Sequence, residues 1–176
     1  MASYAYAVAL GSNQGDRLAH LSAARQFLSS PPVGDPGIPV HASPVYRTEP
    51  VGCPPGAPPF LNAVVAFRSH LEPHALLARI LEFEHEAGRS PAVERAPNAP
   101  RPIDLDILLA AEIVLDSPAL TLPHPRLHLR RFVLQPLADV LPNRIIPGLG
   151  TSASSLLAGL QCDEPPLTLV LPADQW

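Results

Sequence analysis

The sequence contains no lysine, and all twelve of its basic residues are arginine. This absence excludes functions that depend on a lysine side chain, among them a Walker-type phosphate loop and Schiff-base catalysis. A bound phosphate group would therefore have to be held by arginine side chains, by backbone amides or by a metal ion.

Cysteine and charge are also scarce. The two cysteines, Cys53 and Cys162, give neither a disulfide framework nor a zinc-binding spacing, so we expect reduced thiols. Only 16% of the residues are charged, and the net charge of −4 argues against nucleic acid as a partner. The apolar run 4–10 is too short to span a membrane and follows no basic segment, so we expect a cytoplasmic protein with no membrane partner.

Proline, in contrast, is abundant: there are 24 prolines among 176 residues, whereas an average chain has about 5%. They lie in clusters, which predicts long, stiff loops between the regular elements. The length favours a single domain over residues 1–176 with a substantial core.

Apolar periodicity predicts an alternation of strands and helices. Strands are expected at 4–10, 40–47, 60–67 and 101–109, with a helix after the first strand and another after the third. This order predicts an α+β fold of the ferredoxin-like βαββαβ type, an antiparallel sheet with the helices on one face and three long active-site loops.

Later and shorter signals are weaker. Pro44 should make the second strand an edge or a bulge, because proline cannot donate to a sheet. Residues 112–115 are expected to pair with the strand 101–109 as a short hairpin. Helices at 131–141 and 152–160 and a strand at 167–171 are predicted for the remainder.

The strand 101–109 carries the clearest functional signal. Successive side chains of a strand point to opposite faces. Alternation places four apolar residues on one face and two acids on the other, namely Ile103, Leu105, Ile107 and Leu109, and Asp104 with Asp106. Paired buried carboxylates need a counter-charge, and oxygen ligands favour magnesium. With Arg101 placed to meet an anion, the pattern indicates a metal and polyphosphate site; two solvated acids at a strand edge are the alternative.

Arg89 and His124 are further candidates for binding phosphate. Arg89 directly follows Gly88, the expected stop of the second helix, and begins a polar loop. His124 is held between two prolines, a rigid placement that suits a hydrogen bond to phosphate as well as ordinary packing in a loop.

A second group of residues suggests a slot for a flat ligand. Asn62 lies inside an apolar strand, where its amide needs hydrogen-bond partners. With Phe60 and Phe132 it could bind a heterocycle between aromatic rings, or it could be a satisfied core amide. Glu84, on the inner margin of the second helix, is either a snorkelling acid or an acceptor for an exocyclic amine.

Seven motifs together resemble one family. In order they are Leu10-Gly11-Ser12-Asn13-x-Gly15-Asp16, Tyr46-Arg47-Thr48-x-Pro50-Val51-Gly52, Phe60-Leu61-Asn62-Ala63-Val64, Glu84-x-x-x-Gly88-Arg89, Pro100-Arg101-x-Ile103-Asp104-Leu105-Asp106-Ile107-Leu108, Pro123-His124-Pro125-Arg126 and Arg130-x-Phe132-Val133-Leu134-x-Pro136-Leu137. From about residue 4 to residue 142 the chain resembles hydroxymethyldihydropterin pyrophosphokinases. No motif covers residues 143–176, whose role stays open.

The resemblance implies transfer of pyrophosphate from ATP to 6-hydroxymethyl-7,8-dihydropterin in folate biosynthesis, with release of AMP and with two Mg²⁺ ions. We also expect a monomer. The resemblance further implies catalytic roles for Arg89, Arg101 and His124 and metal ligation by Asp104 and Asp106. It implies ATP binding by Glu84, Ile107, Thr121 and Arg130. It implies pterin binding by Gly11, Thr48, Pro50, Val51, Phe60, Asn62 and Phe132.

The chain departs from the family pattern in the loop 90–100. A second arginine expected two positions after Arg89 is replaced by Pro91, and the tryptophan expected just before Pro100 is absent. Arg95 is the only cation left between Arg89 and Arg101, so we expect it to take over a phosphate contact.

Two other functions are compatible with parts of the sequence. A nucleotidyltransferase also combines Gly-Ser with Asp-x-Asp, but its acids follow the Gly-Ser closely, whereas Ser12 and Asp104 are far apart in this chain. A ferredoxin-like binding module with a decayed site is the non-enzymatic alternative, and the intact set of Arg101, Asp104, Asp106 and His124 argues against it.

Overall fold

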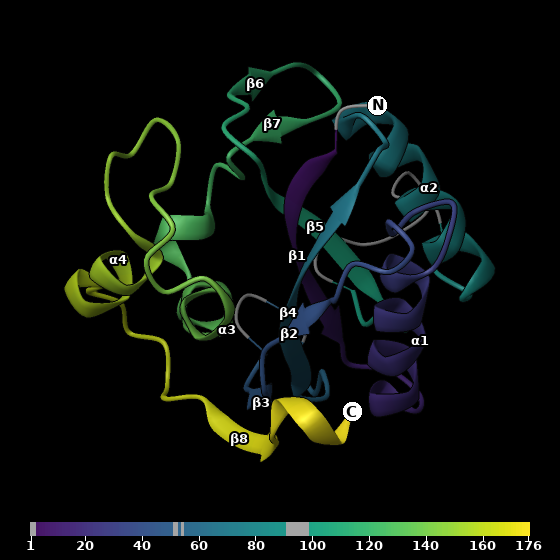
Figure 1. Cartoon of the computed structure of the whole chain (residues 1–176). Coiled ribbons are helices and arrows are strands. Elements are labelled where there is room, and N and C mark those ends of the chain that lie inside the picture. The colour runs from purple at the N-terminus through teal and green to yellow at the C-terminus, as the bar shows by residue number, and fades with distance from the viewer. Residues whose placement is uncertain (1–2, 51–52, 54, 91–98) are drawn as a thin grey trace.

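The computed structural model describes residues 3–50, 53, 55–90 and 99–176. Its main sheet is antiparallel, with the strand order β5-β1-β4-β3-β8 and with β2 also paired to β4 (Figure 1). The strands of this sheet are β1 (Tyr4–Ser12), β2 (His41–Ala42), β3 (Val45–Thr48), β4 (Phe60–Ser69), β5 (Asp104–Ala110) and β8 (Thr168–Leu171). The helices are α1 (Arg17–Ser29), α2 (Pro73–Glu86), α3 (Arg131–Val140) and α4 (Ala153–Gly159), with short 3-10 turns at Leu127–Leu129 and Ala173–Gln175.

The chain order β1-α1-β3-β4-α2-β5 and the sheet order β5-β1-β4-β3 confirm the ferredoxin-like prediction. The predicted strand 40–47 is interrupted at Ser43 and Pro44, which separate β2 from β3. Proline has no N–H to donate to a β-ladder, so the break falls at Pro44, where an edge or a bulge was predicted.

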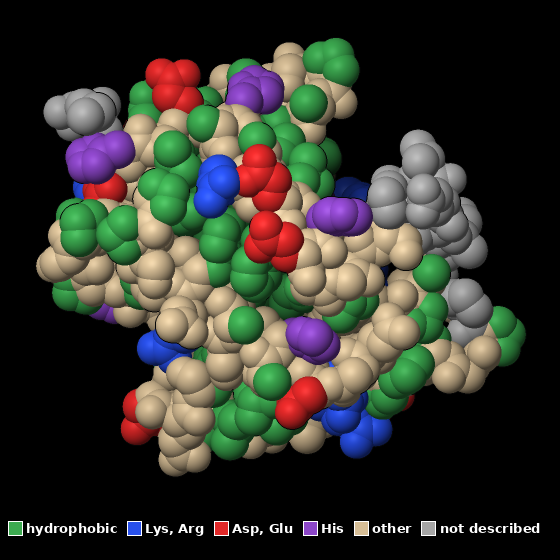
Figure 2. Space-filling view, turned by 90° about the vertical axis from the view of Figure 1, so that its right-hand side faces the viewer, with side chains coloured by type: hydrophobic (Ala, Val, Ile, Leu, Met, Phe, Trp, Pro, Cys, Tyr) green, Lys and Arg blue, Asp and Glu red, His purple; other side chains and the backbone are tan. Residues whose placement is uncertain are grey.

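The sheet carries a separate hydrophobic cluster on each face. Alternate residues of β1 show this: Tyr6, Val8 and Leu10 pack on the side of α1 and α2, and Ala7 packs on the side of α3. Helices α1 and α2 therefore cover one face, as predicted, and α3 and α4 lie on the opposite side of the sheet (Figure 1). Figure 2 shows the molecule from the α1 and α2 side, with acidic and basic side chains scattered among apolar groups.

Two sequence predictions about β5 and its surroundings are wrong. The register between β1 and β5 shifts between Ala7 and Val8, so Leu109 packs in the α3-side cluster and not with Ile107. A bulge reverses the alternation that follows it. The expected pairing of residues 112–115 with β5 is absent; instead β6 (Leu115–Asp116) pairs with β7 (Thr121–Leu122).

Helix α3 covers only part of its sheet face, and this is what creates a site. Its packing partners on the sheet are Ala7, Val64, Leu108 and Leu109. The rows of the sheet near the start of α3 are not covered by the helix, and they form the floor of an open cleft. Of the described residues, no helix combines the length and apolarity needed to cross a membrane.

Candidate active site

Three neighbouring strands form the floor of the cleft. Gly11 in β1 pairs with Asn62 of β4 on one side and with Asp104 of β5 on the other. Two rows along, on the same face, Ala9 pairs with Asp106. A methyl group at position 11 would lie 3.3 Å from Asn62 Oδ1, so glycine lets the amide side chain lie close to the strand.

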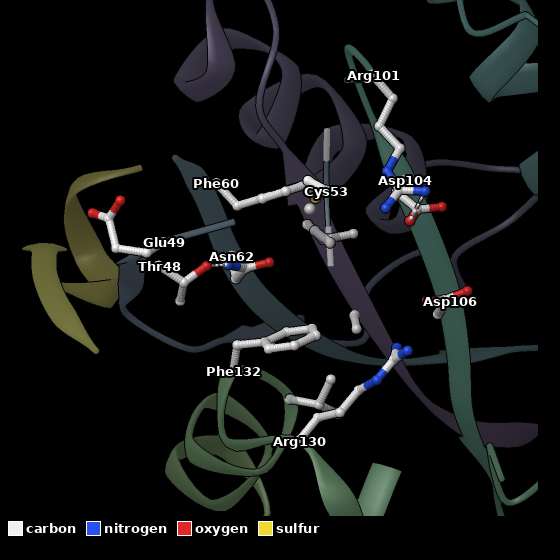
Figure 3. Close-up of a pocket in the computed structure, with 14 residues that line it drawn as sticks. Thr48, Glu49, Cys53, Phe60, Asn62, Arg101, Asp104, Asp106, Arg130 and Phe132 are labelled. Atoms are coloured by element: carbon white, nitrogen blue, oxygen red, sulfur yellow. Dashed lines mark hydrogen bonds and ion pairs between the residues drawn. The ribbon is translucent and has the colours of Figure 1, made fainter. Parts of the chain in front are cut away.

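The cleft encloses about 730 Å³, including its open mouth. In Figure 3, Asp104 and Asp106 extend from β5 on one side, and Thr48 and Asn62 lie on the other. The cleft is lined by Ala9, Leu10, Gly11, Thr48, Glu49, Cys53, Phe60, Asn62, Arg101, Asp104, Asp106, Arg130, Phe132 and Val133. It therefore has an acidic and cationic side and an aromatic and amide side.

On the charged side, two guanidinium groups neutralise Asp104. Arg89 Nη1 lies 2.6 Å from Asp104 Oδ1, and Arg101 Nη1 lies 3.2 Å from Oδ2. Asp106 is different: burial, reinforced by the negative charge of Asp104, raises the pKa of its carboxyl group to about 6 despite the arginines nearby. The nearby arginines thus do not fully offset the cost of burying the charged Asp106 carboxylate, and a further cation beside it would be favourable.

Arg89 reaches Asp104, which lines the cleft, because of the way α2 ends. Gly88 adopts a positive φ of 88°, a conformation that favours glycine, and the Arg89 N–H donates to the Glu84 carbonyl at 3.0 Å. The turn directs the Arg89 side chain back between Glu84 and Asp104, with which it forms ion pairs.

Glu84 holds this corner together from the inside. Its side chain is 5% exposed, and Oε1 accepts a hydrogen bond from the Leu105 N–H at 2.7 Å. Burial raises the pKa of Glu84 to about 7, partly offset by Arg89 and by the Leu105 hydrogen bond. Glu84 thus fixes α2, Arg89 and the strand that carries both acids.

Asn13 places Arg101 at the other end of the acidic side. The Arg101 N–H donates to Asn13 Oδ1 at 2.8 Å, and the Asn13 N–H donates to the Arg101 carbonyl at 3.2 Å. The Nε atoms of Arg89 and Arg101 are buried and make no hydrogen bond to the described residues. Buried donors of this kind normally have a partner, and an anionic ligand could supply one.

The opposite side suits a flat, polar-edged ligand. Asn62 Nδ2 donates to Thr48 Oγ1 at 2.7 Å, which orients the amide. The guanidinium carbon of Arg101 lies 5.6 Å from the Phe60 ring centre, and that of Arg130 lies 5.5 Å from the Phe132 ring centre. Figure 3 shows both rings projecting into the space between Asn62 and the acids.

A second hollow adjoins the cleft at Asp106. Besides Asp106 it is lined by Ile107, Thr121 and His124, although the Ile107 side chain is buried in the core. His124 Nδ1 accepts from the Arg126 N–H at 3.2 Å, so a neutral ring carries its proton on Nε2. Burial, together with the charges of Arg130 and Arg126, lowers the pKa of His124 to about 4. The neutral ring is therefore a hydrogen-bond donor at ordinary pH.

The donors fit magnesium. In proteins this ion usually takes one or two carboxylates and completes its octahedron with water and phosphate oxygens. Asp104 and Asp106 supply two carboxylates, and the described part of the chain offers no group of three or more His, Cys, Asp or Glu that could hold a metal ion. The pair would accordingly bind magnesium together with a phosphate ligand.

Several predicted residues are placed elsewhere. Glu84, Arg89 and Pro50 do not line either hollow, although Arg89 contacts Asp104, which does. Val51 and Arg95 lie outside the described residues, so the expected roles of both stay predictions. Glu49 and Cys53 also line the cleft, and they were not predicted from the sequence. Both belong to the loop before β4, and no local pattern marks them.

The fold and the cleft together define a ferredoxin-like α+β protein whose cleft has a charged side and an aromatic side. The family model for 7,8-dihydro-6-hydroxymethylpterin-pyrophosphokinase matches residues 7–142. The chain belongs to this family and is therefore a pyrophosphokinase.

Curated relatives agree with this assignment. The chain is 43% identical over 136 residues to the 2-amino-4-hydroxy-6-hydroxymethyldihydropteridine pyrophosphokinase of Porphyromonas gingivalis, covering 77% of this chain and 89% of the relative. It is 39% identical over 151 residues to the enzyme of that name from Pseudomonas aeruginosa, covering 86% and 88%.

Solved structures support the fold. The wild-type HPPK-DHPS of Plasmodium falciparum in complex with SDX-DHP superposes with a TM-score of 0.68 at 14% identity, over 89% of this chain and 44% of that one. At this identity the likeness bears on the fold alone.

Proposed function

We propose that the cleft transfers the terminal pyrophosphoryl group of ATP to the hydroxymethyl oxygen of 6-hydroxymethyl-7,8-dihydropterin. The oxygen forms a bond to the β-phosphorus, the bond between this phosphorus and the α,β-bridging oxygen breaks, and AMP leaves. The observation that supports the proposal is the row Asn62–Gly11–Asp104, which puts the amide of Asn62 and the carboxylate of Asp104 on one floor.

The pterin would lie on the aromatic side. Phe60 and Phe132 offer faces for stacking, and the oriented amide of Asn62, with Thr48 behind it, can read the edge of the ring. Gly11 keeps the floor flat beneath the ligand. Because strands lie about 4.8 Å apart, the two ends of the row are about 10 Å apart, and the hydroxymethyl group would point toward Asp104.

The phosphates would lie on the charged side. Arg89 and Arg101 supply guanidinium donors, and their unpaired Nε atoms are available for phosphate oxygens. His124 offers a neutral N–H, and Arg130 and Thr121 lie toward the nucleotide. Asp104 and Asp106 would hold two magnesium ions, which neutralise phosphate charge when bound. The site works by positioning and charge neutralisation, without a covalent nucleophile.

The test is an assay with ATP, Mg²⁺ and the hydroxymethyl pterin, in which AMP formation is followed. AMP should appear only when all three components are present. Formation of AMP at the same rate without the pterin would contradict the proposal, because the chain would then be a hydrolase. A monomeric state and a cytoplasmic location remain predictions from the sequence.

A further inference from the structure

The segment after α4 lies outside the residues matched by the family model. It leaves α4, passes below α3 and runs along the free side of β3 as β8 (Figure 1). The ladder pairs Val45 with Leu171, Tyr46 with Leu169 and Arg47 with Thr168. The strand that ends at Thr48, one wall of the pterin slot, is thus an interior strand and not an edge.

The end of the segment is anchored at the break between β2 and β3 and against α1. Trp176 Nε1 donates to the Ser43 carbonyl at 2.9 Å, at the break between β2 and β3. The Arg25 guanidinium lies 5.2 Å from the Trp176 ring centre and donates to the Ala173 carbonyl at 3.2 Å. These contacts fix the segment independently of anything nearer the cleft.

Between α4 and β8 the segment contacts the other wall of the slot. Glu164 Oε2 accepts a hydrogen bond from the Arg131 N–H at 2.8 Å, at the first residue of α3. The N-cap residue of this helix, Arg130, makes no capping bond with its own side chain. Glu164 therefore supplies from a distance the acceptor and the negative charge that a helix N-terminus favours.

The same stretch faces the slot across a small gap of about 210 Å³. Glu164, Pro165 and Leu167 line one side of it, and Thr48, Glu49 and Phe132 line the other. These last three residues also line the cleft. The C-terminal segment therefore lies behind three of the residues that line the slot.

We propose that Glu164 is a positioning residue for the pterin: its carboxylate fixes the first turn of α3 and thereby the direction of the Phe132 ring. The inference rests on the proposed function, because it assigns the pterin to this slot. The proposal gives the C-terminal segment, which the family model does not match, a role in substrate binding.

The experiment compares Glu164→Ala with Glu164→Gln in the full chain. The alanine variant loses the acceptor and should raise KM for the hydroxymethyl pterin about fivefold, the effect of losing a cap of about 1 kcal/mol. KM for ATP should rise less than KM for the pterin, because Glu164 acts on Arg130 through its charge alone, and kcat should change less than about twofold. The glutamine variant keeps an amide oxygen for the Arg131 N–H and should restore a near-normal KM for the pterin.

Two controls separate positioning from loss of structure. Asp163→Ala removes the exposed acid next to Glu164 and should be kinetically silent. Trp176 is the single tryptophan of the chain, so its emission without ligands reports whether the segment stays docked; it should be unchanged in Glu164→Ala.

The inference is overturned if Glu164→Ala leaves KM for the pterin unchanged or raises both KM values equally. It is also overturned if the glutamine variant is as weak as the alanine variant, or if Trp176 emission shifts to the red, which would mean that the whole segment had detached. If the wild-type chain shows no pterin-dependent transfer, the proposed function itself is wrong.

Discussion

Asn62 and Asp104 lie on either side of Gly11 in one row of the sheet, because Gly11 pairs with both. The residue proposed to read the pterin and the residue proposed to hold magnesium are therefore held at a fixed separation by backbone hydrogen bonds. The first residue of β4, the loop before β5 and the start of α3 then add rings and arginines above this floor. In the proposed mode of binding, the spacing between the heterocycle and the phosphates follows from the sheet.

This relationship predicts the effect of Gly11→Ala. The added methyl group would lie 3.3 Å from Asn62 Oδ1 and 3.9 Å from Phe60 Cδ1, so it should disturb the slot while leaving the strand intact. KM for the pterin should rise several-fold, by analogy with an overpacking cost of about 1–3 kcal/mol, with little change in KM for ATP. The matched control is Gly159→Ala, where a methyl group meets nothing within 4 Å; a similar loss in both variants would contradict the account.

Removing the amide of Asn62 should have a selective effect. In Asn62→Ala the ligand loses partners worth roughly 1–3 kcal/mol, so pterin binding should weaken about tenfold or more while ATP binding is retained. Isothermal titration with each ligand measures this difference. Thr48→Val removes the hydroxyl that orients the amide and should give a smaller loss of the same kind. Equal losses for both ligands in Asn62→Ala would show that Asn62 is structural.

The overall strand and helix order was predictable, because apolar periodicity is local. The position of Leu109 was not, since a register shift between β1 and β5 depends on how two distant strands meet. The partial cover that α3 gives to the second sheet face was likewise missed, because periodicity shows that a helix is amphipathic and not which surface it meets.

The site shows the same division. Asp104 and Asp106 were predicted because alternation within a single strand settles that they share a face. Cys53 was missed because the loop before β4 is placed by distant contacts, such as that of Asn13 Nδ2 with the Pro58 carbonyl at 3.3 Å. Local sequence carries no signal for such a contact.

Neutralising either acid should abolish transfer. Asp104→Asn or Asp106→Asn should lower kcat by on the order of 10²-fold or more, since metal ions contribute several kcal/mol and each tenfold costs about 1.4 kcal/mol. Circular dichroism should show an unchanged fold, and isothermal titration with Mg²⁺ and a non-hydrolysable ATP analogue should show weaker metal binding. Asp163→Asn is the matched control. Near-normal turnover in both cleft variants would end the metal assignment.

Glu84 should make stability depend on pH. Burial raises its pKa to about 7 from 4.5, so the folded state keeps a proton that the unfolded state loses between these values. Its stabilising contribution is present below pH 4.5 and is lost as pH rises through about 7, by at most about 3 kcal/mol at about 1.36 kcal/mol per pH unit. Asp106, with its pKa raised to about 6, acts in the same direction.

Urea unfolding of the wild type and of Glu84→Gln at several pH values isolates this contribution. The glutamine keeps an acceptor for the Leu105 N–H but cannot titrate. The free energy of unfolding of the wild type should fall relative to the variant from pH 4.5 to pH 7. A difference between the two proteins that is constant over this range would show that Glu84 titrates normally.

The central claim is that the bond between the β-phosphorus of ATP and the α,β-bridging oxygen is broken, and that the pyrophosphoryl group moves as a unit. ³¹P NMR of the reaction of ATP with the hydroxymethyl pterin and Mg²⁺ tests it directly. The account predicts AMP together with a pterin product whose two phosphorus atoms are coupled to each other. A pterin product with a single phosphorus, formed with an equal amount of ADP, would contradict it.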